Sequence, residues 1–259
     1  MNKNGIRSVT IVSVFFCLLW LVGLGWAVGE YYAGKPDNIP KKTNVEKKEG
    51  TKKEGLHIVA LGDSLTRGTG DETGKGYVGV LMDEVKEKSK QDVRLTNLGI
   101  TGQRSDQLKE QIQQAEVQRQ IKTADMILVT MGGNDLFRGG QGLLEFDTEE
   151  ITDIEKKFLE NMNFIFQQIR ASNPDSNVFF IGLYNPFIDL EQGKEMSAVV
   201  RHWNYQSAEL SASFPKIVFV PTFDLFELKV NDYLYTDKFH PNTKGYRLIA
   251  ERVASLLTW

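Results

Sequence analysis

Between residues 57 and 257, five short apolar runs alternate with longer segments in which apolar residues recur every three or four positions. The runs have the length of strands, and the segments between them have the period of helices. A strand, a helix and a second strand form a parallel pair, so this alternation predicts an α/β domain with a parallel sheet. The predicted strands are His57–Leu61, Val93–Asn97, Met126–Met131, Val178–Leu183 and Ile217–Val220.

Two of the intervening segments have clear helix signals. One helix is expected to begin near Asp147 or Thr148, with Glu150 placed to complete a cap. Its apolar stripe, interpreted as core packing, consists of Ile151, Ile154, Phe158, Leu159, Met162, Ile165 and Ile169. The last helix opens at Asn242, after Pro241, and its expected inward residues are Leu248, Ile249, Val253, Leu256 and Leu257. The prediction is a three-layer αβα sandwich with a flavodoxin-like, five-stranded parallel sheet.

An uncharged apolar run, Val9–Val28, follows Lys3 and Arg7 near the N-terminus. Its roughly 20 residues match the ~30 Å hydrocarbon core of a bilayer. The run is longer than a typical cleavable signal, and no small-x-small site follows it. Residues 1–30 are therefore predicted to be a membrane anchor, with a removed signal peptide as the alternative. Cys17, the only cysteine, is preceded by large residues, which argues against lipidation.

Residues 31–55 are rich in Lys, Glu, Gly and Pro and are predicted to be a basic flexible tether. Under the positive-inside rule, the lysines of this tether favour the opposite membrane orientation to the one that Lys3 and Arg7 favour. The short basic start before the apolar run is how export signals begin, and it favours an extracellular domain, or a secreted one if the leader is cleaved. Contact between these lysines and anionic headgroups or wall polymers is the alternative to a plain spacer.

The charge of the remaining chain is acidic. Residues 1–55 contain 9 of the 31 Lys and Arg and 5 of the 34 Asp and Glu, which leaves 22 basic and 29 acidic residues in 56–259. This balance gives no electrostatic argument for nucleic-acid binding. The sequence has no Cys/His cluster typical of zinc and no phosphate-binding Gly-x-x-x-x-Gly-Lys, so no metal or organic cofactor is expected.

Four short segments carry candidate chemistry: Gly62-Asp63-Ser64-Leu65, Asn97 to Gly102, Gly132-Gly133-Asn134-Asp135, and Asp237 to Pro241. The first three each follow a predicted strand, and the fourth precedes the last helix. Ligands of open parallel sheets bind outside the carboxyl ends of the strands. The sequence therefore predicts that these segments meet at one edge of the sheet.

Ser64 is the candidate nucleophile, and a serine hydroxyl needs a neighbouring base to remove its proton. Of the three histidines, His57 lies at the entry to the first strand and His202 lies beside Trp203 in a predicted helix. His240 is the candidate base, because Asp237 stands three residues before it and can accept its Nδ1 proton. The alternatives are that Ser64 caps a helix and that the Asp237 loop caps the last helix.

In this order, the four segments resemble those of the SGNH (GDSL-type) hydrolases, over roughly Leu56 to Leu257. The resemblance implies an oxyanion hole made by the backbone N–H groups of Ser64 and Gly102 and by the side-chain amide of Asn134. It points to Gly102 rather than Gly99, because Gly102 belongs to the matching Thr-Gly pair. The Asn134 segment also has the composition of a simple turn. No Gly-x-Ser-x-Gly elbow surrounds Ser64, which argues against the ordinary α/β-hydrolase fold.

These expectations together predict a carboxylic ester hydrolase that works through an acyl-serine. A small-molecule or lipid ester is favoured by the predicted anchor and by apolar residues beside the motifs, namely Leu65, Leu136, Phe137, Phe187 and Phe239. The segment Phe223 to Tyr235 is expected to wall or cover the site. One alternative is an O-acetylesterase acting on cell-wall or extracellular polysaccharide. Another is a catalytically silent binding domain.

Overall fold

The computed structural model describes residues 16–26, 55–137 and 148–257. The chain divides into two units, Met1–Lys52 and Lys53–Trp259. In the first unit, residues 16–26 form a helix. No helix within the described ranges combines the length and the apolar character that a membrane span requires. Most of the predicted anchor and nearly all of the predicted tether lie outside the described residues, so both stay predictions.

The second unit is built on a five-stranded sheet in which all neighbouring strands are parallel, in the order β2-β1-β3-β4-β5. This is the flavodoxin-like order, so the predicted fold class is confirmed. The central strands are apolar along their length because helices cover both faces of the sheet. The strands are β1 (Leu56–Gly62), β2 (Val93–Asn97), β3 (Met126–Thr130), β4 (Asn177–Ile181) and β5 (Ile217–Val220).

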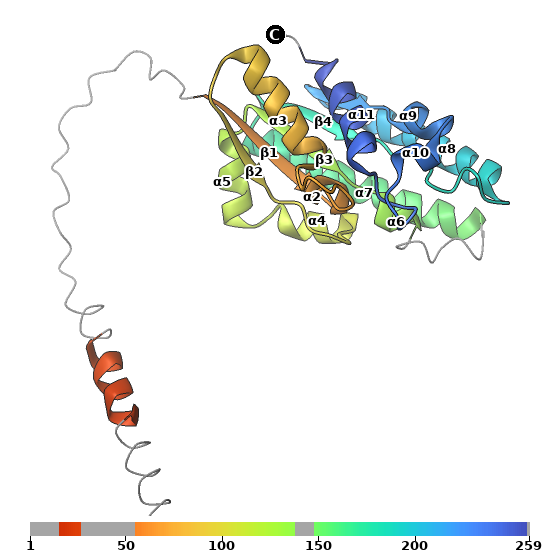
Figure 1. The fold of residues 1–259 in the computed structure, drawn as a ribbon. Coiled ribbons are helices and arrows are strands. Elements are labelled where there is room, and N and C mark those ends of the chain that lie inside the picture. The colour runs from red at the N-terminus through yellow and green to blue at the C-terminus, as the bar shows by residue number, and fades with distance from the viewer. Residues whose placement is uncertain (1–15, 27–54, 138–147, 258–259) are drawn as a thin grey trace, which may run out of the picture. The chain divides into compact units, whose positions relative to one another are not determined.

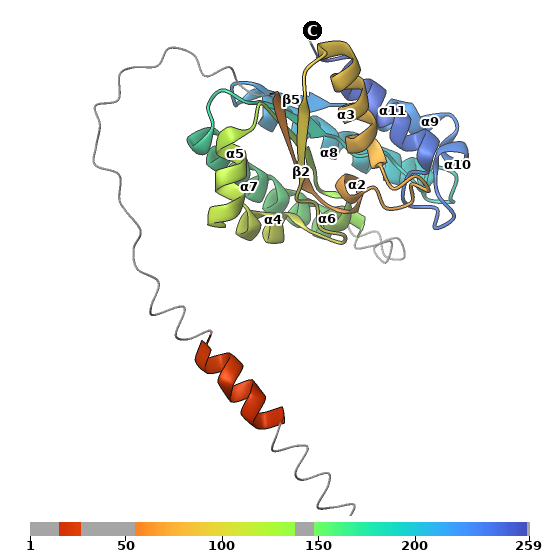
Figure 2. The ribbon, with the colours of Figure 1, turned by 60° about the vertical axis from the view of Figure 1, so that its left-hand side comes forward.

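Helices form a layer on each face of the sheet (Figures 1 and 2). One layer consists of α3 (Gly76–Ser89), α9 (Phe223–Glu227), α10 (Val230–Tyr233) and α11 (Thr243–Ala254). The other consists of α4 (Ser105–Gln111), α5 (Ala115–Thr123), α7 (Thr148–Ser172) and α8 (Gly193–Ala212). Two short helices, α2 (Ser64–Arg67) and α6 (Gly133–Phe137), begin directly after β1 and β3.

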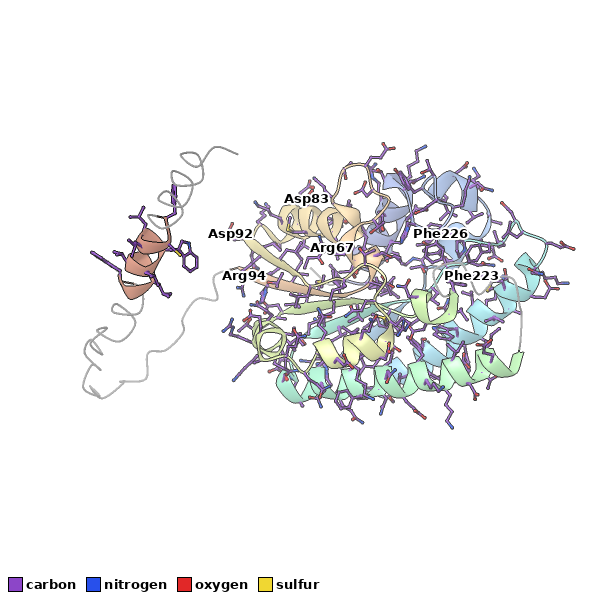
Figure 3. All side chains as sticks on the ribbon, turned by 90° about the horizontal axis from the view of Figure 1, so that it is seen from below. Arg67, Asp83, Asp92, Arg94, Phe223 and Phe226 are labelled. Atoms are coloured by element: carbon purple, nitrogen blue, oxygen red, sulfur yellow. The ribbon has the colours of Figure 1, made fainter. Side chains whose placement is uncertain are left out.

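Alternate residues of β1 serve the two cores. Val59 and Leu61 pack with the residues of α4, α5, α7 and α8, whereas Ile58 and Ala60 pack with those of α3 and α11. Phe226 is fully buried in the second cluster, and its position on α9 can be followed in Figure 3. Two buried layers on a rigid sheet hold the loops at the carboxyl edge in fixed positions.

The two helices with clear sequence signals form where they were predicted. α7 begins at Thr148, although the side chains of Asp147 and Thr148, the two candidate cap residues, lie outside the described part. α11 follows Asn242, whose side chain accepts hydrogen bonds from the N–H groups of Lys244 (2.9 Å) and Gly245 (3.1 Å). The prediction for Leu256 is wrong, because its side chain is 41% exposed. The helix ends at Ala254, so Leu256 no longer follows the helical face, and Tyr246 and Ala250 are buried instead.

Candidate active site

The turn after β1 presents Ser64. Gly62 has a φ of 135°, and a Cβ at this position would lie 2.2 Å from the carbonyl oxygen of Thr130. Asp63 caps α2 by accepting a hydrogen bond from the N–H of Leu65 at 3.0 Å. Ser64 is the first residue of the helix and is 2% exposed. Since Asp63 supplies the cap, the alternative role of Ser64 as the capping residue is wrong.

Asp63 is a buried carboxylate for which sequence reasoning found no role. Its Oδ1 also accepts a hydrogen bond from the hydroxyl of Thr130 at 2.8 Å, which ties the Ser64 turn to β3. Burial raises the pKa of Asp63, and the hydrogen bonds from Thr130 and Leu65 oppose that rise. The signal in the sequence was available, because an Asp directly before a helix is a common N-cap.

The structure brings together Ser64, His240 and Asp237. The Nε2 atom of His240 lies 2.8 Å from the Oγ of Ser64, and its Nδ1 lies 2.7 Å from Oδ2 of Asp237. The other oxygen of Asp237 accepts the N–H groups of Phe239 and His240, each at 3.0 Å. Burial alone would raise the pKa of Asp237, but the hydrogen bonds from His240 and Phe239 lower it. An ionised Asp237 therefore holds the imidazole with Nε2 facing the serine.

The loop between α2 and α3 packs behind His240. Gly70 has a φ of 92°, and a Cβ there would lie 2.7 Å from the carbonyl oxygen of Pro241 and 3.1 Å from the Cβ of His240. Asp71 accepts hydrogen bonds from the Thr243 hydroxyl and the Gly76 N–H, both at 2.7 Å. Burial opposes ionisation of Asp71, but hydrogen bonds from Thr243, Thr73 and Gly76 lower its pKa to about 2. No local pattern in the sequence indicates this contact.

The other two histidines, His57 and His202, contact residues that are not candidates for the site. His57 is buried at the start of β1, the opposite end of the strand from Ser64, and its Nε2 lies 2.9 Å from the hydroxyl of Thr96. Burial and the nearby Arg94 lower the pKa of His57. His202 is exposed on α8, with its Nε2 3.3 Å from a carboxylate oxygen of Glu155 on α7. His57 therefore packs inside the domain, and His202 faces solvent.

Gly102 lies in a tight turn closed by a 3.1 Å hydrogen bond from the N–H of Gln103 to the carbonyl of Ile100. Its φ of 78° suits the third position of a type II turn, which favours glycine. Within the described part of the chain, the N–H groups of Gly102 and Ser64 have no hydrogen-bond acceptor. Both are free to bind an anionic oxygen. Gly99 instead packs against α2, where a Cβ would lie 2.7 Å from the methyl group of Thr66.

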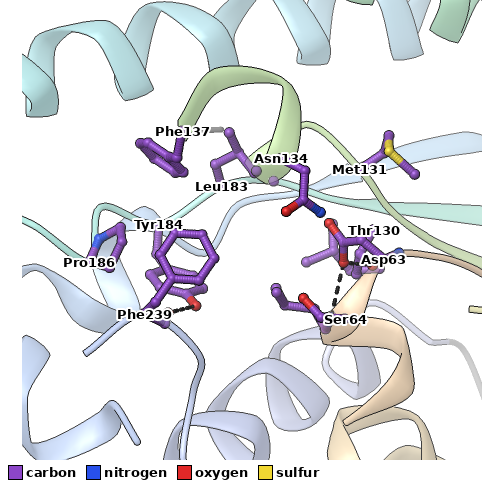
Figure 4. A pocket seen from close by; sticks show the side chains of 14 residues that line it. Asp63, Ser64, Thr130, Met131, Asn134, Phe137, Leu183, Tyr184, Pro186 and Phe239 are labelled. Atoms are coloured by element: carbon purple, nitrogen blue, oxygen red, sulfur yellow. Dashed lines mark hydrogen bonds between the residues drawn. The ribbon is translucent and has the colours of Figure 1, made fainter. Parts of the chain in front are cut away.

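Asn134 lies between this turn and Ser64. Its side-chain amide donates a hydrogen bond to the carbonyl of Gln103 at 3.0 Å. A primary amide carries two N–H groups, so one remains after this bond. Figure 4 shows Asn134 and Ser64 on the same side of a pocket, facing the rings of Phe137, Tyr184 and Phe239.

That pocket is apolar and narrow. Its volume is about 20 Å³, room for about one water molecule. Leu65, Phe137 and Phe239 line it, whereas Phe187 packs edge-on against Phe137 with ring centroids 5.3 Å apart. Leu136 is buried in the core. The other walls include Leu183, Tyr184 and Pro186.

The expectation that Phe223 to Tyr235 walls the site is wrong. This segment forms α9 and α10, and none of its residues lines the apolar pocket. Phe226 instead stacks on the outer side of Tyr184, with ring centroids 4.2 Å apart. The segment therefore supports a wall of the pocket from behind.

A wider groove, about 660 Å³ in volume, lies on the other side of Asn134. It is lined by Gly102 and by mostly polar side chains, among them Arg104, Lys157 and Asn161. Among the described residues, no group of three or more His, Cys, Asp or Glu side chains is arranged to hold a metal ion. Asn134 thus separates a small apolar pocket from a larger polar groove.

Comparison with known proteins places the chain in a family. The GDSL-like lipase/acylhydrolase family matches residues 60–248. The uncharacterized protein YpmR of Bacillus subtilis is 38% identical over 208 residues, covering 78% of this chain and 81% of YpmR. The spore germination lipase LipC of Bacillus licheniformis is 27% identical over 206 residues, covering 76% of this chain and 94% of LipC.

Solved structures agree. The lipase Lip_vut3 from a goat rumen metagenome has a TM-score of 0.71 at 25% identity, covering 77% of this chain and 96% of that one. The acetylxylan esterase Axe2 from Geobacillus stearothermophilus has a TM-score of 0.57 at 18% identity, covering 78% and 94%, and shares the fold. The chain therefore belongs to the GDSL-like lipase/acylhydrolase family, whose members are ester hydrolases.

Proposed function

We propose that the protein hydrolyses carboxylic esters through a covalent acyl-serine at Ser64, with His240 as the base and Asp237 as its orienting carboxylate. The observation that carries this proposal is the hydrogen-bonded chain from Ser64 to His240 (2.8 Å) and from His240 to Asp237 (2.7 Å). It is the arrangement that activates a serine for acyl transfer.

The reaction proceeds in two balanced halves. The Oγ of Ser64 adds to the ester carbonyl carbon while its proton passes to Nε2 of His240, and the carbonyl electron pair moves onto oxygen. The resulting oxyanion collapses, the bond to the alcohol breaks, and His240 gives its proton to the leaving oxygen. A water molecule then adds to the acyl-serine, loses its proton to His240, and the acid departs as Ser64 regains a proton.

The developing oxyanion would be held by three donors: the backbone N–H groups of Ser64 and Gly102 and the remaining amide N–H of Asn134. The free backbone N–H groups and the position of Asn134 beside Ser64 support this assignment. Fixed donors of this kind stabilise charge as it forms, and loss of one typically lowers turnover about 100- to 1000-fold.

The acyl group is proposed to enter the apolar pocket, and the alcohol portion is proposed to face the polar groove. Apolar walls such as Leu65 and Phe137 favour an acyl chain, and LipC and Lip_vut3 are described as lipases. A second candidate, an O-acetylesterase acting on polysaccharide, is favoured by one observation. The pocket volume of about 20 Å³ admits little more than a methyl group unless its side chains move.

Hydrolysis of p-nitrophenyl esters from acetate to palmitate by the full-length chain tests this function and separates the two substrates. We expect the wild type to hydrolyse these esters, Ser64→Ala to lose the activity and His202→Ala to keep it. His202 serves as the control because it is an exposed histidine of α8 with no proposed catalytic role. A preference for medium or long acyl chains supports the lipid ester, whereas activity on acetate alone supports the O-acetylesterase. Hydrolysis that persists in Ser64→Ala would contradict the proposed nucleophile.

We further propose that residues 1–30 anchor the protein in the cell membrane with the domain outside. The uncharged run Val9–Val28 after a short basic start supports this proposal. The full chain should stay in the membrane fraction after carbonate extraction, and its domain should be digested by protease added to intact spheroplasts. Release into the soluble fraction, without cleavage of the leader, would contradict anchoring.

A further inference from the structure

We infer that Asp135 is a positioning residue that holds the Gly102 turn, and with it the backbone N–H donor, in register with Ser64. The inference rests on the proposed ester hydrolysis. It concerns a residue for which the sequence analysis gave no role. The carboxylate of Asp135 binds Ser105 rather than any group proposed to react, so it acts through the loop that it binds.

Both oxygens of Asp135 bind Ser105, three residues after Gly102. The N–H of Ser105 donates to Oδ1 at 3.2 Å and to Oδ2 at 3.1 Å, and the hydroxyl of Ser105 donates to Oδ1 at 2.5 Å. Asn161 on α7 in turn donates to the Ser105 hydroxyl at 3.1 Å. Ser105 is therefore fixed from α6 and from α7.

Asp135 and its neighbour Asn134 act on the same turn. Asn134 donates to the carbonyl of Gln103, one residue after Gly102, while Asp135 binds Ser105. The consecutive side chains of Asn134 and Asp135, at the start of α6, therefore hold the backbone that follows Gly102. Since Asn134 is also a proposed oxyanion donor, this linkage fixes two of the three donors relative to each other.

The balance between burial and hydrogen bonding favours a specific role for the Asp135 carboxylate. Burial raises the pKa of Asp135, and the hydrogen bonds from Ser105 oppose that rise. Burying a carboxylate is costly unless hydrogen bonds compensate it. The start of α4 also has a separate capping bond, from the N–H of Arg104 to Oε1 of Gln107 at 3.0 Å, which does not involve the α6 segment.

Gln107 therefore provides a matched control. Gln107→Ala removes a capping bond from the same helix start but leaves both links to α6 intact. Asp135→Ala removes the link to Ser105. If Asp135 only stabilised α4, the two variants would lose similar amounts of kcat. If Asp135 positions the Gly102 turn, Asp135→Ala should lower kcat far more than Gln107→Ala.

The test uses the full-length chain, a p-nitrophenyl ester that the wild type hydrolyses, and a trifluoromethyl ketone whose adduct with Ser64 carries an oxyanion. We expect Asp135→Ala to lower kcat about 10- to 100-fold, because small misplacements of catalytic groups have effects of this size. KM should stay within about twofold, and the ketone should bind more weakly by a factor similar to the loss in kcat. Gln107→Ala should keep kcat and ketone affinity within about twofold.

Ser105→Ala and Asp135→Asn keep the test decisive if Asp135→Ala does not fold. Ser105→Ala removes the hydroxyl bonds to Asp135 and from Asn161 but keeps the Ser105 N–H. Asp135→Asn keeps one oxygen that can accept that N–H. Both should show smaller losses in kcat, again matched by weaker ketone binding. Unchanged ketone affinity in the Asp135 variants, or equal losses in Gln107→Ala, would overturn the inference. Failure of the proposed function itself is distinguishable, because Ser64→Ala would then remain active.

Discussion

The close packing behind His240 requires a residue without a side chain at position 70. At Gly70, a Cβ would meet the Pro241 carbonyl at 2.7 Å and the Cβ of His240 at 3.1 Å. Gly70→Ala should therefore displace the imidazole from Ser64 and lower kcat at least about tenfold. Steady-state kinetics on a p-nitrophenyl ester would measure this loss.

Gly74 in the same loop is the matched control for that substitution. It also has a positive φ, 69°, but a Cβ there would meet nothing within 4 Å. Both alanine variants carry the backbone strain, about 1–2 kcal/mol, of a left-handed alanine. Only Gly70→Ala adds the clash, so equal kcat values in the two variants would show that the loop does not support His240.

Part of the site could be predicted from the types of residue in the sequence. Ser64, Asp237 and His240 could be found because nucleophile, base and carboxylate are distinctive residue types, and their segments lie next to strand ends or the last helix. The capping role of Asp63 could have been predicted from the sequence, whereas the contacts that Asp63 and Asp135 make far along the chain could not. Asp63 binds Thr130 and Asp135 binds Ser105, and no local pattern announces either contact.

At the scale of elements, the sheet was predictable because its buried strands are short apolar runs. β2 and β5 have the predicted boundaries, and β3 and β4 end one and two residues earlier than expected. The chain leaves the sheet there to form the loops that carry Asn134 and Tyr184. The burial of Leu256 was misjudged because helical periodicity does not reveal where α11 ends.

Segments without a regular pattern were harder to assign. The composition of Phe223 to Tyr235 suggested a pocket wall, but Phe226 stacks on Tyr184, and Val230 and Leu234 are buried in the core that contains the residues of α11. Aromatic content alone cannot distinguish a residue that lines a pocket from one that packs behind it. The narrow pocket is instead lined by Phe137 and Phe239, which flank the motifs directly.

At the scale of the whole molecule, the fold gathers groups from distant parts of the chain. Ser64 and His240, which lie 176 residues apart in sequence, come within hydrogen-bond distance because β1 and the start of α11 reach the same edge of the domain. Asn134 comes to this edge after β3. Each group is carried by a loop or short helix at the sheet edge, and the two buried cores hold these segments in place.

Covalent labelling of the full-length chain with a fluorophosphonate tests the central claim, that this arrangement activates Ser64. Mass spectrometry of the digested protein should find the label on Ser64, and labelling should be lost in Ser64→Ala and strongly slowed in His240→Ala. Labelling in His202→Ala should match the wild type. A folded chain that leaves Ser64 unlabelled, or that labels equally fast without His240, would contradict the account.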